Sequence, residues 1–131
     1  MKIKKFIILV NAGIDQQNAC VNAYQFTKTA LINGHQIINV FFYQNGVTQS
    51  NQLLSPASDE FNLNVAWQAL ASEYGISLTN CVSAALRRGI LSAEDAKDQQ
   101  NQQWNCEAPF NMGGLGELIT GIETADRLVR F

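Results

Sequence analysis

The residue best suited to direct chemistry is Cys81, within the stretch TNCVSAALRRG at residues 79–89. An apolar run over 76–81 predicts a strand, and residues 82–88 predict a short helix that ends at Gly89. Cys81 would then lie where a strand meets a helix, beside unpaired backbone N–H groups that favour a thiolate over a thiol. Such a cysteine could act as a sulfur nucleophile, and a small buried apolar side chain would suit the same position.

Two cations, Arg87 and Arg88, stand at the end of the same predicted helix. Long side chains on a helix lean back toward its N-terminus, so these arginines could contact an anionic substrate or partner near Cys81. Arginines in a last turn also stabilise a helix C-terminus by themselves, and seven residues span about 10 Å of helix, which argues against direct contact with the sulfur. Both roles stay open at the level of the sequence.

Strands and helices that could position these residues alternate along the chain. Strands are predicted at residues 3–10, 36–43, 76–81 and 127–131. Helices are predicted at 19–32, from Ser55 or Ser58 up to Gly75, at 82–88, from Ser92, and at 114–125. In the second helix, Asp59 and Glu60 would occupy the first turn and favour the helix dipole.

This alternation predicts an α/β fold with three layers, in which a mainly parallel five-stranded sheet has helices on both faces. Residues 3–10 form a long apolar run without polar alternation, so they are expected to be a central strand. Residues 1–131 are the size of one domain. Because function gathers at the C-terminal ends of parallel strands, the loop at 11–17 and the junction at Cys81 are expected to share one functional edge.

Composition and charge limit the classes of partner. A formal net charge of -2 leaves no basic excess for direct binding of nucleic-acid phosphates. Three cysteines at wide spacing, Cys20, Cys81 and Cys106, do not form a complete disulfide framework and favour a reducing compartment. The lysine-rich start is followed by too short an apolar run for a signal peptide, and the chain has no apolar run of bilayer length, so we expect a cytoplasmic protein.

Other chemistries fail their sequence requirements. The glycines at 113–116 lack the spacing of a dinucleotide fingerprint, and neither a phosphate-binding GxxxxGK[ST] loop nor a GxSxG elbow occurs. His35 is the single histidine and follows a glycine before a strand, which predicts a turn residue rather than a catalytic base. One histidine and three scattered cysteines without a CxxC pair do not predict a metal site.

Four stretches in order resemble the TusD family of the DsrE-like superfamily, a sulfurtransferase subunit of the bacterial TusBCD sulfur-relay complex. They are FFYQNGV (41–47), SPASDEFNLNVAWQAL (55–70), NCVSAALRRGI (80–90) and GGLGELITGIETADRLVRF (113–131). The resemblance implies a carrier of persulfide sulfur for 2-thiouridine formation at the tRNA wobble position, with Cys81 as the sulfur-carrying residue and no metal or organic cofactor. It also implies TusB-like and TusC-like partner subunits in a heterohexamer, a TusA-like sulfur donor and a TusE-like acceptor.

The sequence departs from this family in places. The loop NAGIDQQN at 11–18 replaces a loop with proline and glycine, and residues 98–106 are unusually rich in amides. Within them, residues 98–105 have almost no core-forming side chain except Trp104, which predicts a mobile surface loop. Cys20 and Cys106 match no position with an assigned role, so each is either incidental or a secondary redox residue.

Two other classes of function remain open. A non-catalytic DsrE-like assembly subunit would keep the fold without needing Cys81. A flavodoxin-like mononucleotide binder would use the loops at the strand ends for a ligand. Assembly would also explain the many large apolar side chains, which can either pack in the core or cover a permanent interface. These are Phe41, Phe42, Trp67 and Trp104.

Overall fold

The computed structural model describes residues 2–131 and contains a five-stranded sheet within them. Its strands are β1 (Lys5–Val10), β2 (Gln36–Phe42), β3 (Leu78–Cys81), β4 (Phe110–Gly113) and β5 (Arg127–Arg130). They lie in the order β4-β3-β2-β1-β5, and every neighbouring pair is parallel. The predicted α/β class is confirmed, and the sheet is wholly rather than mainly parallel.

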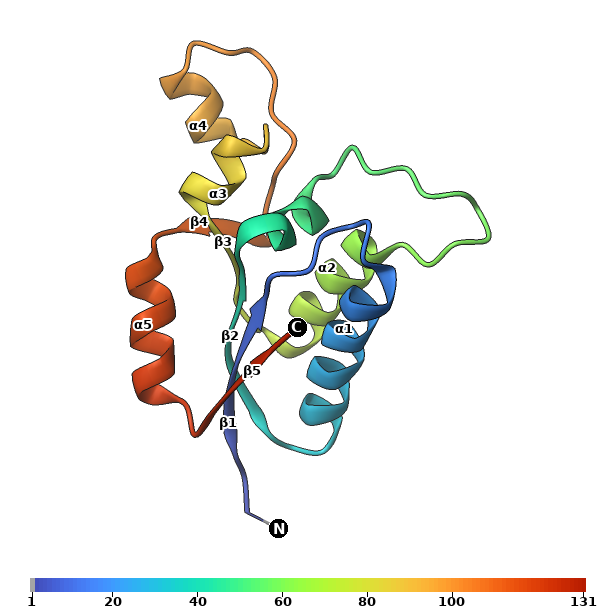
Figure 1. Ribbon diagram of the computed structural model, residues 1–131, viewed down its shortest axis with the longest axis vertical. Helices are drawn as coiled ribbons and strands as arrows, with labels where there is room; N and C mark the ends of the chain where they lie inside the picture. Colours follow the sequence, from blue (N-terminus) through green and yellow to red (C-terminus); the bar gives the residue numbers. More distant parts are fainter. Residues whose placement is uncertain (1) are drawn as a thin grey trace.

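The helices cover both faces of the sheet and its C-terminal edge (Figure 1). They are α1 (Gln17–Ile32), α2 (Leu63–Tyr74), α3 (Val82–Arg87), α4 (Ala93–Asp98), α5 (Leu115–Thr124) and the 3₁₀ helix η1 (Gln44–Ser50). Helices α1 and α2 lie on one face and α5 lies on the other. This division follows from right-handed crossovers, because the chain moves from β1 toward β4 and then returns past β1 to form β5.

β1 is a central strand, as its long apolar run predicts, with β2 paired to it on one side and β5 on the other. The fifth strand, which the sequence pattern did not locate, is β4 at the sheet edge. Only Phe110 of its four residues is buried, and the strand holds no β-branched residue, so β4 lacks the usual strand signal.

The predicted start of the second helix is wrong. Helix α2 begins at Leu63, where the Oδ1 atom of Asn62 accepts a hydrogen bond from the N–H of Val65 at 3.2 Å. The acidic segment before it forms a local turn instead, in which Glu60 Oε1 accepts from the N–H of Ala57 at 3.1 Å. A side chain that bonds the nearby backbone offers the chain an alternative to a helix, so Ser55 and Ser58 do not cap one here.

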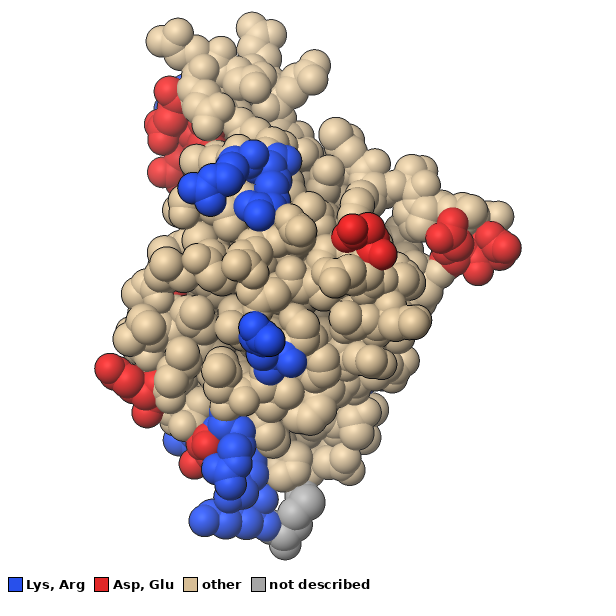
Figure 2. Space-filling model, viewed as in Figure 1, with Lys and Arg blue, Asp and Glu red and all other residues tan. Residues whose placement is uncertain are grey.

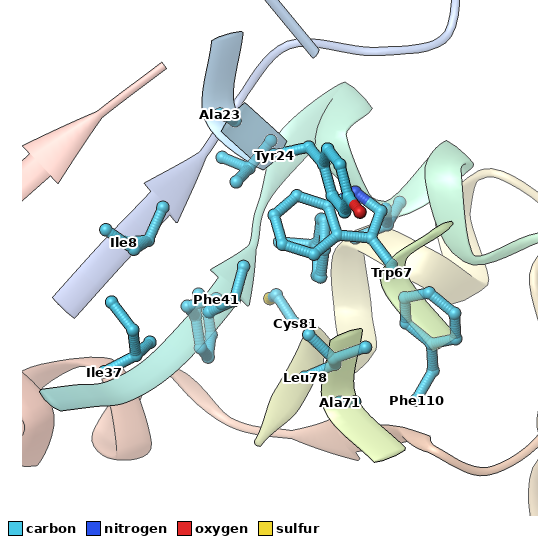
Figure 3. Packing of buried hydrophobic residues seen from close by; sticks show 14 of the residues in the cluster. Ile8, Ala23, Tyr24, Ile37, Phe41, Trp67, Ala71, Leu78, Cys81 and Phe110 are labelled. Atoms are coloured by element: carbon cyan, nitrogen blue, oxygen red, sulfur yellow. The ribbon is translucent and has the colours of Figure 1, made fainter. Parts of the chain in front are cut away.

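The core joins the sheet to α1 and α2 through aromatic side chains (Figure 3). The Trp67 ring lies 5.4 Å from the rings of both Tyr24 and Phe42 in edge-to-face arrangements. Phe41, Phe42 and Trp67 are all 0% exposed, so they belong to the core and not to an interface. Trp104 is 41% exposed and donates a hydrogen bond to Glu107. Within residues 2–131, no helix combines the length and apolarity needed to cross a bilayer.

Candidate functional site

Cys81 occupies the predicted junction between strand and helix. It is the last residue of β3 and the N-cap of α3, with an extended backbone (φ -62°, ψ 117°) that turns the chain from one element into the other. In the sheet it pairs with Gly113 at the end of β4. The residue therefore lies at the C-terminal edge of the sheet, where α/β proteins place their functional groups.

The Cys81 thiol faces the protein interior. Its residue is 1% exposed and packs within the hydrophobic core, and Figure 3 shows the sulfur on the side of Phe41. The Sγ atom lies 3.5 Å from the hydroxyl oxygen of Ser83. Ser83 itself is exposed, so the sulfur is one side chain away from solvent.

A buried polar cluster lies beside Cys81 and was not foreseen from the sequence. The Nδ2 group of Asn80 donates to Ser50 Oγ at 2.7 Å and to Cys106 Sγ at 3.5 Å. Burial raises the pKa of the Cys106 thiol above its ordinary value, although the hydrogen bonds from Ser50 and Asn80 act in the opposite direction. The cluster joins β3 to η1 and to the segment before β4.

Cys20 has a structural contact of its own. Its thiol lies 3.0 Å from the carbonyl oxygen of Gly13 and donates to it, which ties α1 to the loop after β1. Burial, and secondarily the charge of Asp15, raises the pKa of Cys20 to about 11. A thiol held in its protonated form is a poor nucleophile, so Cys20 is better suited to packing than to sulfur chemistry.

The loops at the strand ends are held down by close contacts. The N–H of Tyr43 donates to the carbonyl oxygen of Val10 at 2.9 Å, and a side chain at Gly46 would collide with that same carbonyl. Gln49 donates to Ala12 O at 3.1 Å and accepts from the indole N–H of Trp67 at 2.9 Å. Helix η1 is therefore a largely buried link between the loop after β1 and α2.

The two arginines of α3 have different surroundings. Arg88 donates through Nη1 to the carbonyl of Ala84 at 3.0 Å and through Nε to Asn45 Oδ1 at 2.8 Å. Arg88 thus caps the C-terminus of α3, which is one of the two roles that the sequence left open for the arginines. It also ties α3 to η1. Arg87 lies in the last turn and is exposed.

Across residues 2–131, no group of three or more histidine, cysteine, aspartate or glutamate residues could hold a metal ion. The three cysteines are free and buried.

Comparison with known proteins places the chain in a family. A model of the DsrE/DsrF-like family matches residues 4–131, so the chain belongs to this family. A protein of Proteus mirabilis named sulfurtransferase TusD is 51% identical over 110 residues, which cover 84% of this chain and 85% of that protein. A sulfurtransferase TusD homolog of Vibrio vulnificus is 40% identical over the full length of both chains. These relatives confirm the resemblance found in the sequence and support a role in sulfur transfer.

A solved structure agrees on the fold. The crystal structure of the ychN protein from E. coli matches with a TM-score of 0.75 and covers 98% of this chain and 100% of its own. The two sequences are 13% identical, so this likeness concerns the fold alone.

Proposed function

We propose that the chain is a sulfurtransferase that carries sulfur as a persulfide on Cys81. The observation that carries the proposal is the position of Cys81 at the end of β3, in a chain whose relatives are named sulfurtransferases. Cys20 in α1 and Cys106 before β4 lie outside this junction, and burial raises the pKa of each of these two thiols. The physiological reaction we propose is delivery of sulfur for 2-thiouridine at the tRNA wobble position, in the cytoplasm.

The proposed step is a thiol–persulfide exchange. The Cys81 thiolate attacks the outer sulfur of a donor persulfide, a new S–S bond forms at Cys81, and the S–S bond of the donor breaks. The donor leaves as a thiolate and takes up the proton that Cys81 lost, so no external oxidant or reductant is needed. A second exchange passes the outer sulfur to an acceptor cysteine and restores the Cys81 thiol.

Access to the sulfur requires the junction to open. Because Cys81 is 1% exposed, a donor must displace the residues that cover it before attack is possible. Helix α3 has six residues, of which only Ala84 and Ala85 are buried, so moving it costs fewer buried contacts than moving a longer helix. Docking of the donor would then control both the exposure of the thiol and the choice of partner.

Partners follow from the same proposal. TusB-like and TusC-like subunits would complete a heterohexamer, while a TusA-like donor and a TusE-like acceptor visit Cys81. Arg87, exposed at the end of α3, is the residue we expect to contact an acidic surface on a visiting protein. Helix α5 offers the assembly an apolar surface through Leu115, Ile119 and Ile122, which are 40–55% exposed.

Sulfur loading of cysteine variants tests the proposal. The chain, assembled with its partner subunits, is incubated with a persulfide donor, and intact mass spectrometry measures the gain of one sulfur atom. Cys81→Ser should fold and assemble yet gain no sulfur, whereas Cys20→Ser and Cys106→Ser should still gain it. Loss of tRNA 2-thiolation in cells carrying Cys81→Ser would link the step to its product. Sulfur on Cys81→Ser, together with its loss in Cys20→Ser or Cys106→Ser, would move the role to another cysteine.

A second candidate is a non-catalytic assembly subunit of the same family. The burial of Cys81 within the core favours it, because a small apolar residue would fill the same space. Under this alternative none of the three variants changes sulfur loading of the assembled complex or tRNA thiolation. Cys81→Ala would then also leave thiolation unchanged.

A further inference from the structure

A polar cleft of about 540 Å³ opens at the C-terminal ends of β1 and β5. It is lined by the loop after β1, the first turn of α1, the start of η1, the end of α3 and the end of β5. Cys81 is not among its lining residues, so the cleft is separate from the thiol of the sulfur exchange described above.

The position of the cleft in the sheet is one that favours a ligand. The connection from β1 leads toward β2 by way of α1, while β5, on the other side of β1, is reached through α5 on the opposite face. The strand order therefore reverses between β1 and β5. In open parallel sheets a crevice forms at such a reversal, outside the carboxyl ends of the strands, and small ligands bind there.

Two guanidinium groups give this cleft a positive charge. Arg88 comes from the end of α3 and Arg130 from the end of β5, and the described lining residues include no aspartate or glutamate. In Figure 2, lysine and arginine atoms gather over α3 and near the end of β5. Even with a terminal carboxylate at Phe131, two guanidiniums leave a net positive site. The main-chain oxygen of Phe131 is already occupied by the N–H groups of Asn11 and Ala12.

Arg88 is held in place with donors to spare. Its Nε and Nη1 atoms bond Asn45 and Ala84, which fixes the plane of the guanidinium and leaves the Nη2 donors uncommitted. A guanidinium in a fixed plane loses little conformational freedom when it binds an oxyanion. Arg130 is exposed and can approach the same ligand from β5.

The start of α1 adds donors on the same side. Its N-cap residue, Gln16, makes no side-chain cap, and its Oε1 atom accepts instead from the N–H of Gly13 at 3.3 Å. The first turn of α1 contains no acidic residue, and Ala19 of that turn lines the cleft. The positive end of a 16-residue helix thus reinforces the two arginines.

A buried acceptor suggests what the anion is attached to. Asn11 lines the cleft and donates through Nδ2 to Gln44 Oε1 at 2.7 Å. Its Oδ1 atom is buried and has no hydrogen-bond partner among the described residues. A buried acceptor without a donor is costly, and a hydroxyl group on a ligand would satisfy it.

We propose that this cleft binds a phosphomonoester of a hydroxylated small molecule. Arg88 and Arg130 hold the phosphate by charge-assisted hydrogen bonds, the start of α1 supports it, and Asn11 accepts from a hydroxyl of the esterified part. The ligand class is thus set by two arginines and one unsatisfied amide oxygen.

Titration of the full chain with adenosine 5′-monophosphate and with inorganic phosphate tests this site. Calorimetry at low salt should show saturable binding, and Arg130→Gln should weaken it by about tenfold because one charge-assisted contact is lost. Arg127→Gln is the matched control, since it removes the same charge at the opposite end of the same strand and should keep the affinity. Cys81→Ser should also bind normally, which separates this result from the fate of the sulfur-transfer proposal.

The two probes distinguish the source of the phosphate. Tighter binding of the nucleotide, with the preference removed in Asn11→Leu, supports an ester with a hydroxyl group. If inorganic phosphate binds as tightly as the nucleotide, the anion site is supported and the proposal of an esterified ligand is overturned. Absence of saturable binding by either probe, or equal weakening by Arg130→Gln and Arg127→Gln, overturns the site as a whole.

Discussion

The two faces of the sheet are covered to different extents. On one face, α1 and α2 enclose the aromatic cluster of Tyr24, Phe42 and Trp67, in which every ring finds a packed neighbour. On the other face lies α5, of whose ten residues two are buried, Leu118 and Gly121. The first face is a finished core, whereas the second leaves apolar side chains in contact with water.

The α5 face has the features of a surface that another subunit completes. Leu115, Ile119 and Ile122 recur at helical spacing and stay exposed. Beside the helix runs a groove of about 550 Å³, which is lined in part by Ile38 and Gly121. An exposed apolar surface of this kind is typical of interfaces. Substitutions on the α1 and α2 face should therefore change stability, whereas substitutions on the α5 face should change assembly.

The largest effect should come from the finished face. Trp67→Ala removes a fully buried ring that contacts two other aromatic rings and donates a hydrogen bond to Gln49. We expect a loss of about 3–5 kcal/mol in the free energy of unfolding, measured by urea denaturation. A loss below about 1 kcal/mol would mean that this cluster does not dominate the stability of the chain.

An intermediate effect, on assembly rather than stability, should come from the α5 face. Ile119→Lys places a charge on a side chain that is 55% exposed, so it should change the free energy of unfolding by less than about 0.5 kcal/mol. When the Ile119→Lys chain is co-expressed with TusB-like and TusC-like subunits, sedimentation should nevertheless show a smaller particle than with the unsubstituted chain. The matched control is Val65→Lys on α2, which is 57% exposed and lies on the finished face. If Val65→Lys disrupts the particle and Ile119→Lys does not, the assembly surface lies on the α1 and α2 face and not on the α5 face.

The smallest effect concerns a contact that joins the end of α5 to β1. The carboxylate of Asp126 accepts a hydrogen bond from the N–H of Lys5 at 2.8 Å, and this bond, with nearby lysines, holds the pKa of Asp126 below its ordinary value. A carboxyl whose pKa is lower in the folded state stabilises the fold above its unfolded pKa of about 3.8, and that contribution is lost as the pH falls through the folded value.

Asp126→Asn should therefore lower stability slightly near neutral pH and reduce the acid sensitivity of unfolding below about pH 4. Thermal unfolding measured from pH 2 to 7 would reveal the change. Asp59→Asn, in an exposed loop, serves as the control for removing a carboxylate. Identical pH profiles for Asp126→Asn and the unsubstituted chain would show that the contact with Lys5 contributes nothing.

Local pattern was sufficient for much of the fold. The apolar runs of β1, β2 and β3 and the caps of the helices depend on neighbours in the chain, and their elements lie within a few residues of the predicted bounds. The capping box of α4, between Ser92 and Asp95, is one such local signal. Two exceptions had local causes: β4 carries little apolar pattern, and the acidic turn before α2 satisfies its own backbone.

The candidate site was predictable only in part. The position of Cys81 at a strand end followed from a short run of residues, because a strand and a helix are each local structures. Its burial, and the contact of Asn80 with Ser50 and Cys106, join segments up to thirty residues apart in the chain. Tertiary packing alone could decide that Phe41 and Trp67 fill the core.

The sequence by itself determined the family, the alternation of strands and helices, and the presence of a cysteine at a strand end, since each is written in contiguous residues. Only the tertiary structure decided which side chains from distant segments meet. Arg88 and Arg130 share a cleft because β5 returns to the free edge of β1, and α5 is left half-covered because one crossover alone passes on its side of the sheet. Both results depend on strand order, which no local pattern specifies.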